Sequence, residues 1–351
     1  MATVPLAPER FFASDNNAAV HPVVLAALEK ANQGHAVAYG DDPWTHAAED
    51  SFQDLFGCPV RSFMTWNGTG ANVLALATAM RPAGAVICTD VAHINVDETG
   101  APEKILGSKL IDVPSIAGRM APEQVRAWAH NLGVVHHVQP CVLSITQSTE
   151  WGTLYSPTEI AVLCDVAHEL GMIVHLDGAR LANATAALGG TRQTLRSFTV
   201  DAGVDVVSFG GTKNGMMYGE AVVYINTALA ESAGFWRKQI TQLPSKVRYI
   251  SAQFSALLSD DLWLGNAQHA NDMAQVLYEA VRDVPGVEVA PPVVNSLFPA
   301  LPHDLAESLR EWSFFYDWDI ARQQVRWMTS WDTTPADIEQ FAAGLRYFAT
   351  R

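Results

Sequence analysis

Two short, mostly apolar runs, each ending in a charged residue, constrain this chain more than any other feature. Residues 172–176 lead to Asp177, and residues 204–209 lead to Lys213 in the turn Gly-Gly-Thr-Lys-Asn-Gly. Runs of this length and composition are typical of buried strands. Because charged groups are rarely buried without partners, a carboxylate and an amine at two strand ends predict a functional site. A structural ion pair in the core is the alternative.

The order of elements predicts an α/β protein with a mostly parallel sheet. Between about residues 60 and 225, expected helices alternate with expected strands at residues 61–66, 86–89, 141–146, 172–177 and 204–209. Such alternation produces a sheet that helices cover on both faces. A long expected helix at 263–281 is followed by expected strands at 286–289, 296–298 and 324–329. We therefore expect a large domain over residues 1–255, including the N-terminal segment, and a smaller α+β domain over residues 256–351.

Polar residues follow several of these strands, at the edge where open α/β sheets bind ligands. Asn67-Gly68-Thr69-Gly70 joins a strand to an apolar helix at 71–80, so its free N–H groups and the helix dipole suit an anion. A tight turn without a ligand is the alternative. His93 and Gln147 each follow a further strand, and a surface histidine is the alternative for His93. We expect these residues to converge on one crevice with Asp177 and Lys213.

Pyridoxal phosphate would account for the amine and the carboxylate together. Lys213 fits the amine that bonds the cofactor's aldehyde, and the flanking glycines let it reach the ring. Asp177 fits the acid that keeps the pyridine nitrogen protonated, so that the ring accepts electrons from the substrate. Gly68 and Thr69 are the candidates for binding phosphate, and His93 for stacking on the ring.

Two arginines are candidates for binding anionic groups. Arg180 follows Asp177 closely and suits the phosphate, the ring oxygen or a substrate oxygen, with a salt bridge at a helix start as the alternative. Arg326 lies within an expected strand, where a half-buried guanidinium pairs best with a planar anion such as a substrate carboxylate. A structural pair with an aspartate is its alternative.

Charge and composition argue against several classes of protein. The net charge of −15 argues against nucleic acid and anionic membrane surfaces as partners. The first ten residues resemble no signal peptide, and the longest apolar run, residues 73–80, is too short to span a bilayer. No metal site is expected. The cysteines, which are scattered and predict reduced thiols in a cytoplasmic protein, are Cys58, Cys88, Cys141 and Cys164.

Taken together, these motifs resemble the low-specificity L-threonine aldolases, which are aminotransferase-like, fold-type I pyridoxal-phosphate enzymes. The resemblance covers nearly the whole chain and rests on Ser14-Asp15, Tyr39-Gly40-Asp41-Asp42-Pro43, Asn67-Gly68-Thr69-Gly70-Ala71-Asn72, Ala92-His93, Asp177-Gly178-Ala179-Arg180 and Lys213. It implies that Lys213, Asp177 and His93 bind the cofactor ring, and that Gly68 and Thr69 bind its phosphate. The residues that it implies for the substrate are Ser14, Asp15, Tyr39, Arg180 and Arg326.

The resemblance also implies a homotetramer in which two chains build each active site. Arg248 or Lys246 would then be the cation that one chain extends to the phosphate of its neighbour. The implied reaction is retro-aldol cleavage of L-threonine, L-allo-threonine and related β-hydroxy-α-amino acids, phenylserine among them, to glycine and an aldehyde. The alternatives are β-elimination or transamination on the same cofactor, and a catalytically silent cofactor-binding protein. A nucleotide-binding protein is disfavoured, because the lysine-serine pair of a P-loop is missing.

One departure from the family concerns the residue that accepts the β-hydroxyl proton. Some members carry Glu-Asn-Thr-His-Asn where residues 146–150 here read Thr-Gln-Ser-Thr-Glu. The histidine often assigned to the hydroxyl is therefore absent from that loop. His93 acting through a water, Glu150 and Asp15 are the three candidates that remain open.

Overall fold

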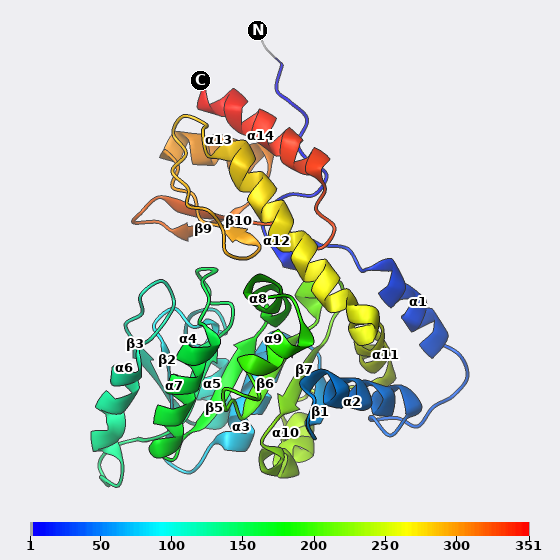
Figure 1. The fold of residues 1–351 in the computed structure, drawn as a ribbon, viewed down its shortest axis with the longest axis vertical. Helices are drawn as coiled ribbons and strands as arrows, with labels where there is room; N and C mark the ends of the chain where they lie inside the picture. The colour runs from blue at the N-terminus through cyan, green and yellow to red at the C-terminus, as the bar shows by residue number, and fades with distance from the viewer. Residues whose placement is uncertain (1–2, 351) are drawn as a thin grey trace.

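The computed structural model describes residues 3–350, and its larger part is built on a seven-stranded sheet (Figure 1). The strands in sheet order are β1 (Arg61–Thr65), β7 (Glu220–Tyr224), β6 (Val206–Gly210), β5 (Ile173–Gly178), β4 (Gln139–Thr146), β2 (Gly84–Thr89) and β3 (Lys109–Val113). Neighbouring strands are parallel except where β7 pairs with β1 and β6. The prediction of an α/β protein with a mostly parallel sheet is confirmed.

Helices cover both faces of this sheet. On one face α3 (Gly68–Ala79) and α10 (Ala233–Gln239) bury their side chains against alternate residues of β6 and β7. On the other face α2 (Pro43–Phe56), α7 (Pro157–Glu169) and α11 (Arg248–Leu258) form the largest core cluster. α3 is apolar on all sides because it is buried nearly all round. The other helices of this part are α1 (Pro22–Ala31), α4 (His93–Val96), α5 (Ala101–Leu106), α6 (Pro122–Arg126), α8 (Leu181–Leu188) and α9 (Arg192–Ser197).

A smaller unit lies beyond one end of this layered structure (Figure 1). It contains the antiparallel sheet β8-β10-β9 and two helices, and the long helix α12 (Leu262–Val281) runs into it from the larger unit. Its elements are β8 (Ser296–Leu297), α13 (His303–Trp312), β9 (Tyr316–Asp319), β10 (Gln324–Met328) and α14 (Pro335–Ala349). Phe12 packs in the core of this unit, and its carbonyl accepts a 2.8 Å hydrogen bond from the Met328 N–H. The N-terminal stretch thus joins the smaller unit, while the domain boundary near residue 255 stays a prediction.

Some expected elements differ from the observed ones. The strand expected at 286–289 is only an isolated bridge between Glu288 and Ala300, because Pro291 and Pro292 follow and cannot continue a ladder. The sequence predicts one surface helix over residues 120–132, whereas the structure has α6 followed by a 3₁₀ turn, Ala127–Asn131. β3, β9, α10 and α11 were not predicted. Within residues 3–350, no helix has both the length and the apolar character needed to cross a membrane.

Candidate active site

The carboxyl ends of β4, β5 and β6 and the first turn of α3 enclose a cavity of about 340 Å³. The expected convergence of strand-end residues on one crevice is confirmed there. The predicted site residues that line the cavity are Gly68, Thr69, His93, Glu150, Asp177, Arg180 and Lys213. Gln147 is the exception, because its amide forms two hydrogen bonds with the Tyr155 backbone in the core.

Asp177 lies near the end of β5, in register with Ser208 of the parallel neighbour β6. Its Oδ1 accepts a hydrogen bond from the Ala179 N–H at 3.0 Å, and its Oδ2 accepts one from Asn72 Nδ2 at 2.9 Å. Burial raises the pKa of Asp177, but the nearby His93 and these hydrogen bonds outweigh burial, so the net shift is downward. The site therefore holds an ionised carboxylate that is only 4% exposed.

Lys213 lies in the 3₁₀ turn Thr212–Asn214, directly after β6. Glycine is needed just before this turn, since a Cβ on Gly210 would lie 2.3 Å from the carbonyl oxygen of Ala179. No group within residues 3–350 forms a hydrogen bond or an ion pair with the Lys213 amine. Burial, and then repulsion from Arg180, lower the pKa of Lys213. These surroundings favour a neutral amine, which is the nucleophilic form.

The first turn of α3 presents free donors to the same cavity. Asn67 caps the helix, and its Oδ1 accepts the Gly70 N–H at 2.8 Å. The N–H groups of Gly68 and Thr69 have no acceptor in the described chain, and both residues line the cavity. An anion placed there would gain both donors and the positive end of the helix dipole.

His93 opens α4 and lies between two carboxylates. Its backbone N–H donates to Glu150 Oε1 at 2.9 Å, and its Nδ1 lies 2.8 Å from Glu98 Oε1. The hydrogen bond with Glu98 is the main cause that raises the pKa of His93 above its usual value. The sequence predicts Glu98 on the helix that follows His93, whereas in the structure it occupies the turn between α4 and α5.

Glu150 follows β4 in the loop that departs from the family pattern. Its Oε1 also accepts a hydrogen bond from Thr146 Oγ1 at 2.9 Å, whereas its buried Oε2 has no partner in the described chain. Burial raises the pKa of Glu150 to about 7. This carboxyl can therefore exchange a proton near neutral pH.

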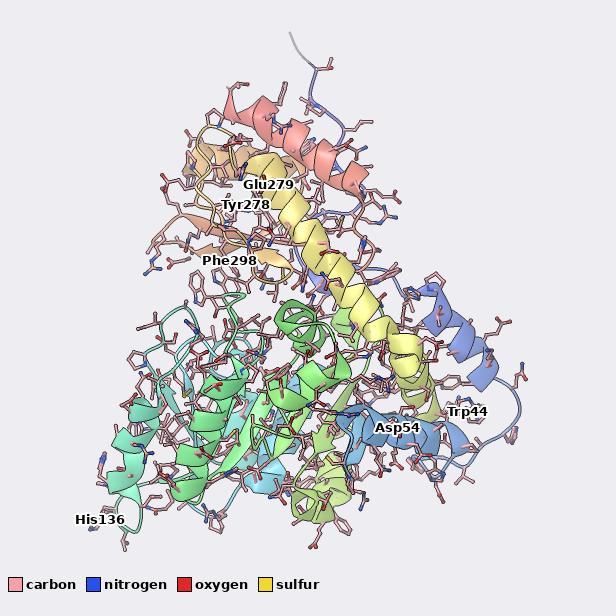
Figure 2. All side chains as sticks on the ribbon, in the orientation of Figure 1. Trp44, Asp54, His136, Tyr278, Glu279 and Phe298 are labelled. Atoms are coloured by element: carbon pink, nitrogen blue, oxygen red, sulfur yellow. The ribbon has the colours of Figure 1, made fainter. Side chains whose placement is uncertain are left out.

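A second chamber of about 310 Å³ shares one wall with the cavity and lies against the smaller unit. The side chains that line both spaces are Asn16, His93, Glu150, Arg180 and Lys213. The second chamber is completed by Ser14, Asp97, Tyr316, Asp317, Trp318 and Arg326. Beside it, Phe298 packs on Trp151 and Trp318 with ring centroids 5.4 and 5.3 Å apart. Figure 2 labels Phe298 on the side of the smaller unit that faces the sheet, so this aromatic contact joins the two units.

The two arginines of the second chamber differ in how their charge is compensated. Arg180 forms a bidentate ion pair with Asp15 at 2.7 and 2.8 Å, and Asn295 also donates to Asp15. Asp15 itself lines neither chamber. Arg326 forms no ion pair with any described residue, and its guanidinium lies 4.8 Å from the centre of the Trp318 ring. Burial, and then Arg180, lower the pKa of Arg326 to about 10.

Besides Asp15, three predicted site residues lie outside both chambers of their own chain. Tyr39 is 54% exposed, and the Lys238 amine lies 5.0 Å from its ring centre. Arg248 stacks on Tyr249 at 5.0 Å, and Lys246 is exposed. Conversely, several residues that line the chambers were given no role from the sequence: Asn16, Asn72, Glu98, Ser208, Glu220, Tyr316 and Trp318. Asn72 belongs to a motif of the resemblance and Glu98 follows His93 by five residues, but neither position alone indicates a role, because only packing brings these side chains to the site.

The donors of the cavity fit pyridoxal phosphate. Lys213 offers an amine without a partner, Asp177 an ionised acid on the neighbouring strand, and the α3 turn offers free N–H groups. These are the groups needed at the aldehyde, the ring nitrogen and the phosphate, respectively. All three line the same cavity.

Comparisons with known proteins agree with this arrangement. The chain matches the beta-eliminating lyase family over residues 12–302. It is 44% identical to a low-specificity L-threonine aldolase of Pseudomonas sp., covering 95% of this chain and 96% of that protein. It is 42% identical, over the same shares, to the low-specificity L-threonine aldolase of Pseudomonas aeruginosa. Its fold is similar to that of the threonine aldolase of Leishmania major, with a TM-score of 0.88 and 29% identity over 96% of this chain and 99% of that one.

Proposed function

Because this chain belongs to the low-specificity L-threonine aldolases within the beta-eliminating lyase family, we propose which substrates it cleaves and which residues act on them. Proteins of this family depend on pyridoxal 5′-phosphate, so the chain is a pyridoxal-phosphate-dependent carbon–carbon lyase. Its proposed substrates are L-threonine, L-allo-threonine and related β-hydroxy-α-amino acids, including phenylserine. The proposed products are glycine and an aldehyde. The observation that carries this proposal is the single cavity shared by Lys213, Asp177 and the α3 turn.

Lys213, Asp177, His93, Gly68 and Thr69 are the residues that would hold the cofactor. When bound, the cofactor supplies an electron sink that weakens the Cα–Cβ bond of the amino acid. Asp177 holds a proton on the ring nitrogen, which its low pKa and its two hydrogen bonds support. Lys213 provides the amine for the aldehyde carbon.

Arg326 is the proposed anchor of the substrate carboxylate. It is a half-buried cation without a counter-ion in the described chain, its buried Nε has no hydrogen-bond partner there, and it faces the chamber that adjoins the cofactor cavity. A planar carboxylate would satisfy its fork of donors. Arg180 and Ser14 line the same chamber and would bind the other carboxylate oxygen. The Asp15 pair sets the orientation of Arg180, so we assign Asp15 a supporting role.

Glu150 is the proposed acceptor of the β-hydroxyl proton. Asp15 is less suited, because two hydrogen bonds from Arg180 occupy it and it lines neither chamber. His93 is also less suited, because Glu98 favours its protonated form. Glu150 combines a pKa of about 7 with a free Oε2 and lines both chambers. A water between His93 and the hydroxyl remains the competing route.

Analysis of the products formed from L-threonine tests the proposed reaction. We expect glycine and acetaldehyde in equal amounts. Ammonia with an oxo acid would instead indicate β-elimination, and an oxo acid without ammonia would indicate transamination. A protein that binds the cofactor but turns over no β-hydroxy amino acid would be catalytically silent.

Lys213→Ala should abolish turnover, and Asp177→Ala should lower kcat roughly 10³-fold or more, because the electron sink is lost. Full activity of Lys213→Ala would contradict the assignment.

The proposed assembly is a homotetramer whose sites are shared between chains. Tyr39, Lys246 and Arg248 lie outside the chambers of their own chain, which supports a role for them in a neighbour's site. Lys213 and Arg180 are the only lysine and arginine among the described residues that line the cavity. A cytoplasmic location also stays a prediction, and the four unpaired cysteines suit it.

A further inference from the structure

Glu98 is a buried carboxylate beside the site, and its side chain is 0% exposed. Its Oε1 lies 2.8 Å from His93 Nδ1 and 2.8 Å from Asn72 Nδ2, and its Oε2 has no partner in the described chain. Its carboxylate accepts no backbone hydrogen bond from residues 3–350, so it does not cap the turn in which it lies. A buried acid is costly unless it is paired, so its position needs a reason beyond the local turn.

Asn72 connects this acid to the residue that faces the ring nitrogen. Its Nδ2 donates to Glu98 Oε1 at 2.8 Å and to Asp177 Oδ2 at 2.9 Å. An amide nitrogen has two hydrogens, so these two carboxylates use its full donor capacity. His93, Glu98, Asn72 and Asp177 therefore form one hydrogen-bonded unit that is buried except at the His93 ring, although Asn72 and Asp177 are 105 residues apart in the chain.

The unit determines which nitrogen of His93 faces the reaction. A carboxylate can only accept, so Nδ1 carries the hydrogen that points at Glu98. Nε2 is then the nitrogen without a partner in the described chain, and the ring lines both chambers. A carboxylate that orients an imidazole through Nδ1 is a recurrent device in catalysis.

We propose that Glu98 is a positioning residue of the aldolase site, which fixes the tautomer and orientation of His93 and, through Asn72, is coupled to Asp177. This role rests on the proposed function for its effect on catalysis. The charged groups facing His93 are Glu98 from the α4–α5 turn, Asp177 from β5, Glu150 from the loop after β4 and Lys213 from the turn after β6. Glu98 is the only one of these in contact with a ring nitrogen within residues 3–350.

Nitrogen NMR of the full-length protein, with histidines labelled by ¹⁵N, tests the proposal without any turnover. His93→Asn identifies the signals of His93. Above the pKa of His93 we expect a protonated Nδ1 and an unprotonated Nε2, with and without bound cofactor. The opposite tautomer, or a mixture of both, would overturn the proposal. Because this readout needs no substrate, it separates failure of the inference from failure of the proposed reaction.

Glu98→Gln tests the consequence for catalysis. The substitution keeps an acceptor but removes the charge, so the pKa of His93 should fall and the tautomer should become mixed. Groups that orient a functional imidazole typically contribute about 10- to 100-fold, and we expect a loss of that size in kcat with little change in KM. Asn72→Leu removes the link to Asp177. This variant should lower kcat, but it should lower the pKa of His93 less than Glu98→Gln does.

Asp205→Asn is the matched control. Asp205 holds His168 at 2.8 Å, a pair that lies at the opposite ends of the strands. This variant should leave both the tautomer of His93 and kcat unchanged. If Glu98→Gln titrates like the parent at His93 and keeps the parental pH profile, Glu98 is not a positioning residue.

Discussion

Arg326 carries an uncompensated charge in the free protein and is the proposed partner of the substrate carboxylate in the complex. Its half-buried guanidinium lies beside Trp318 and near the like charge of Arg180, and it has no counter-ion in the described chain. Arg326→Leu should therefore raise KM for L-threonine by about 10- to 100-fold, the value of a charge-assisted hydrogen bond of roughly 1.5–3 kcal/mol.

The same substitution should leave the thermal stability unchanged or raise it, because an uncompensated charge is removed. Steady-state kinetics and a melting curve of one preparation check both expectations. Arg10→Leu is a control, since Arg10 is a partly exposed arginine paired with acids far from the site. An unchanged KM in Arg326→Leu would remove this residue from carboxylate binding.

Glu150 should produce an acidic limb in the pH profile. Its pKa is raised to about 7, so the ionised form that accepts a proton is lost below that pH and present above it. The value of kcat/KM should thus rise with pH through about 7. Glu150→Gln should lower it by about 10²-fold or more, the usual range for a general base, and should abolish this limb.

Glu103 is the matched control that separates the loss of the Glu150 carboxylate from a general change in the charge of the protein. Glu103 accepts a hydrogen bond from the Leu110 N–H on the exposed side of α5. Glu103→Gln should keep the parental profile. An acidic limb that persists in Glu150→Gln would point to His93 and its water as the acceptor.

Individual site residues were predictable where a local rule applied to them. Asp177, Lys213 and His93 follow strands, and the rule that strand ends converge needs no knowledge of packing. The roles of Asn72 and Glu98 were not predictable, because their contacts depend on how α3 and the α4–α5 turn pack across β5. The pairing of Arg180 with Asp15 joins residues 165 apart and is equally invisible in the sequence.

At the scale of elements, the close approach of β6 to the turn after β5 sets where Lys213 meets Asp177. A Cβ on Gly210 would lie 2.3 Å from the Ala179 oxygen and 2.7 Å from its carbonyl carbon, and backbone atoms there cannot yield cheaply. Gly210→Ala should therefore lower the stability by about 1–3 kcal/mol, as for other overpacked sites, and weaken cofactor retention.

Gly265→Ala on α12 is the control, since within residues 3–350 the added Cβ would meet no atom closer than 4 Å apart from its chain neighbours and its own helix backbone. This change should stabilise the protein slightly, by about 0.5–1 kcal/mol. Chemical denaturation together with the cofactor content of the purified variants measures both effects. Parental stability and full cofactor in Gly210→Ala would refute the steric account.

Elements were predictable where apolar periodicity was strong, as in β4, β5 and β6. β9 was missed because its aspartates alternate with aromatic residues, and β3 because Lys109 and Asp112 interrupt its short apolar run. Exposed charged side chains are expected on edge strands such as these two. α10 and α11 lie in a stretch with clustered cations, a proline and little apparent order, although Arg237 is buried within α10. Tertiary packing determines the secondary structure of such segments.

At the scale of the whole molecule, the proposal of shared sites makes a prediction about mixtures. Lys213→Ala removes the amine of a chain's own site, whereas Arg248→Ala would damage only the neighbour's. When the two variants are co-expressed in equal amounts, activity should be recovered, because a pair made of one chain of each variant contains one intact site. Random pairing across a two-fold interface should then give about a quarter of the parental rate.

Each variant alone, and a mixture of Lys213→Ala with Asp177→Ala, should stay inactive. The second mixture is the control, since Lys213 and Asp177 line the same cavity of one chain. Recovery in that control, or none in the first mixture, would show that Arg248 does not act across chains. The oligomeric state could be expected only from family resemblance, because the contacts between chains leave no periodic pattern in one sequence.

The central claim is that Lys213 bonds the aldehyde of pyridoxal phosphate in the cavity it shares with Asp177. Borohydride reduction of the purified protein, followed by peptide mass mapping, tests it directly, because reduction makes the bond between the amine and the cofactor permanent. The account predicts one pyridoxyl group per chain, on Lys213, and none in Lys213→Ala. A pyridoxyl group on any other lysine, or no modification of a protein that contains the cofactor, would contradict it.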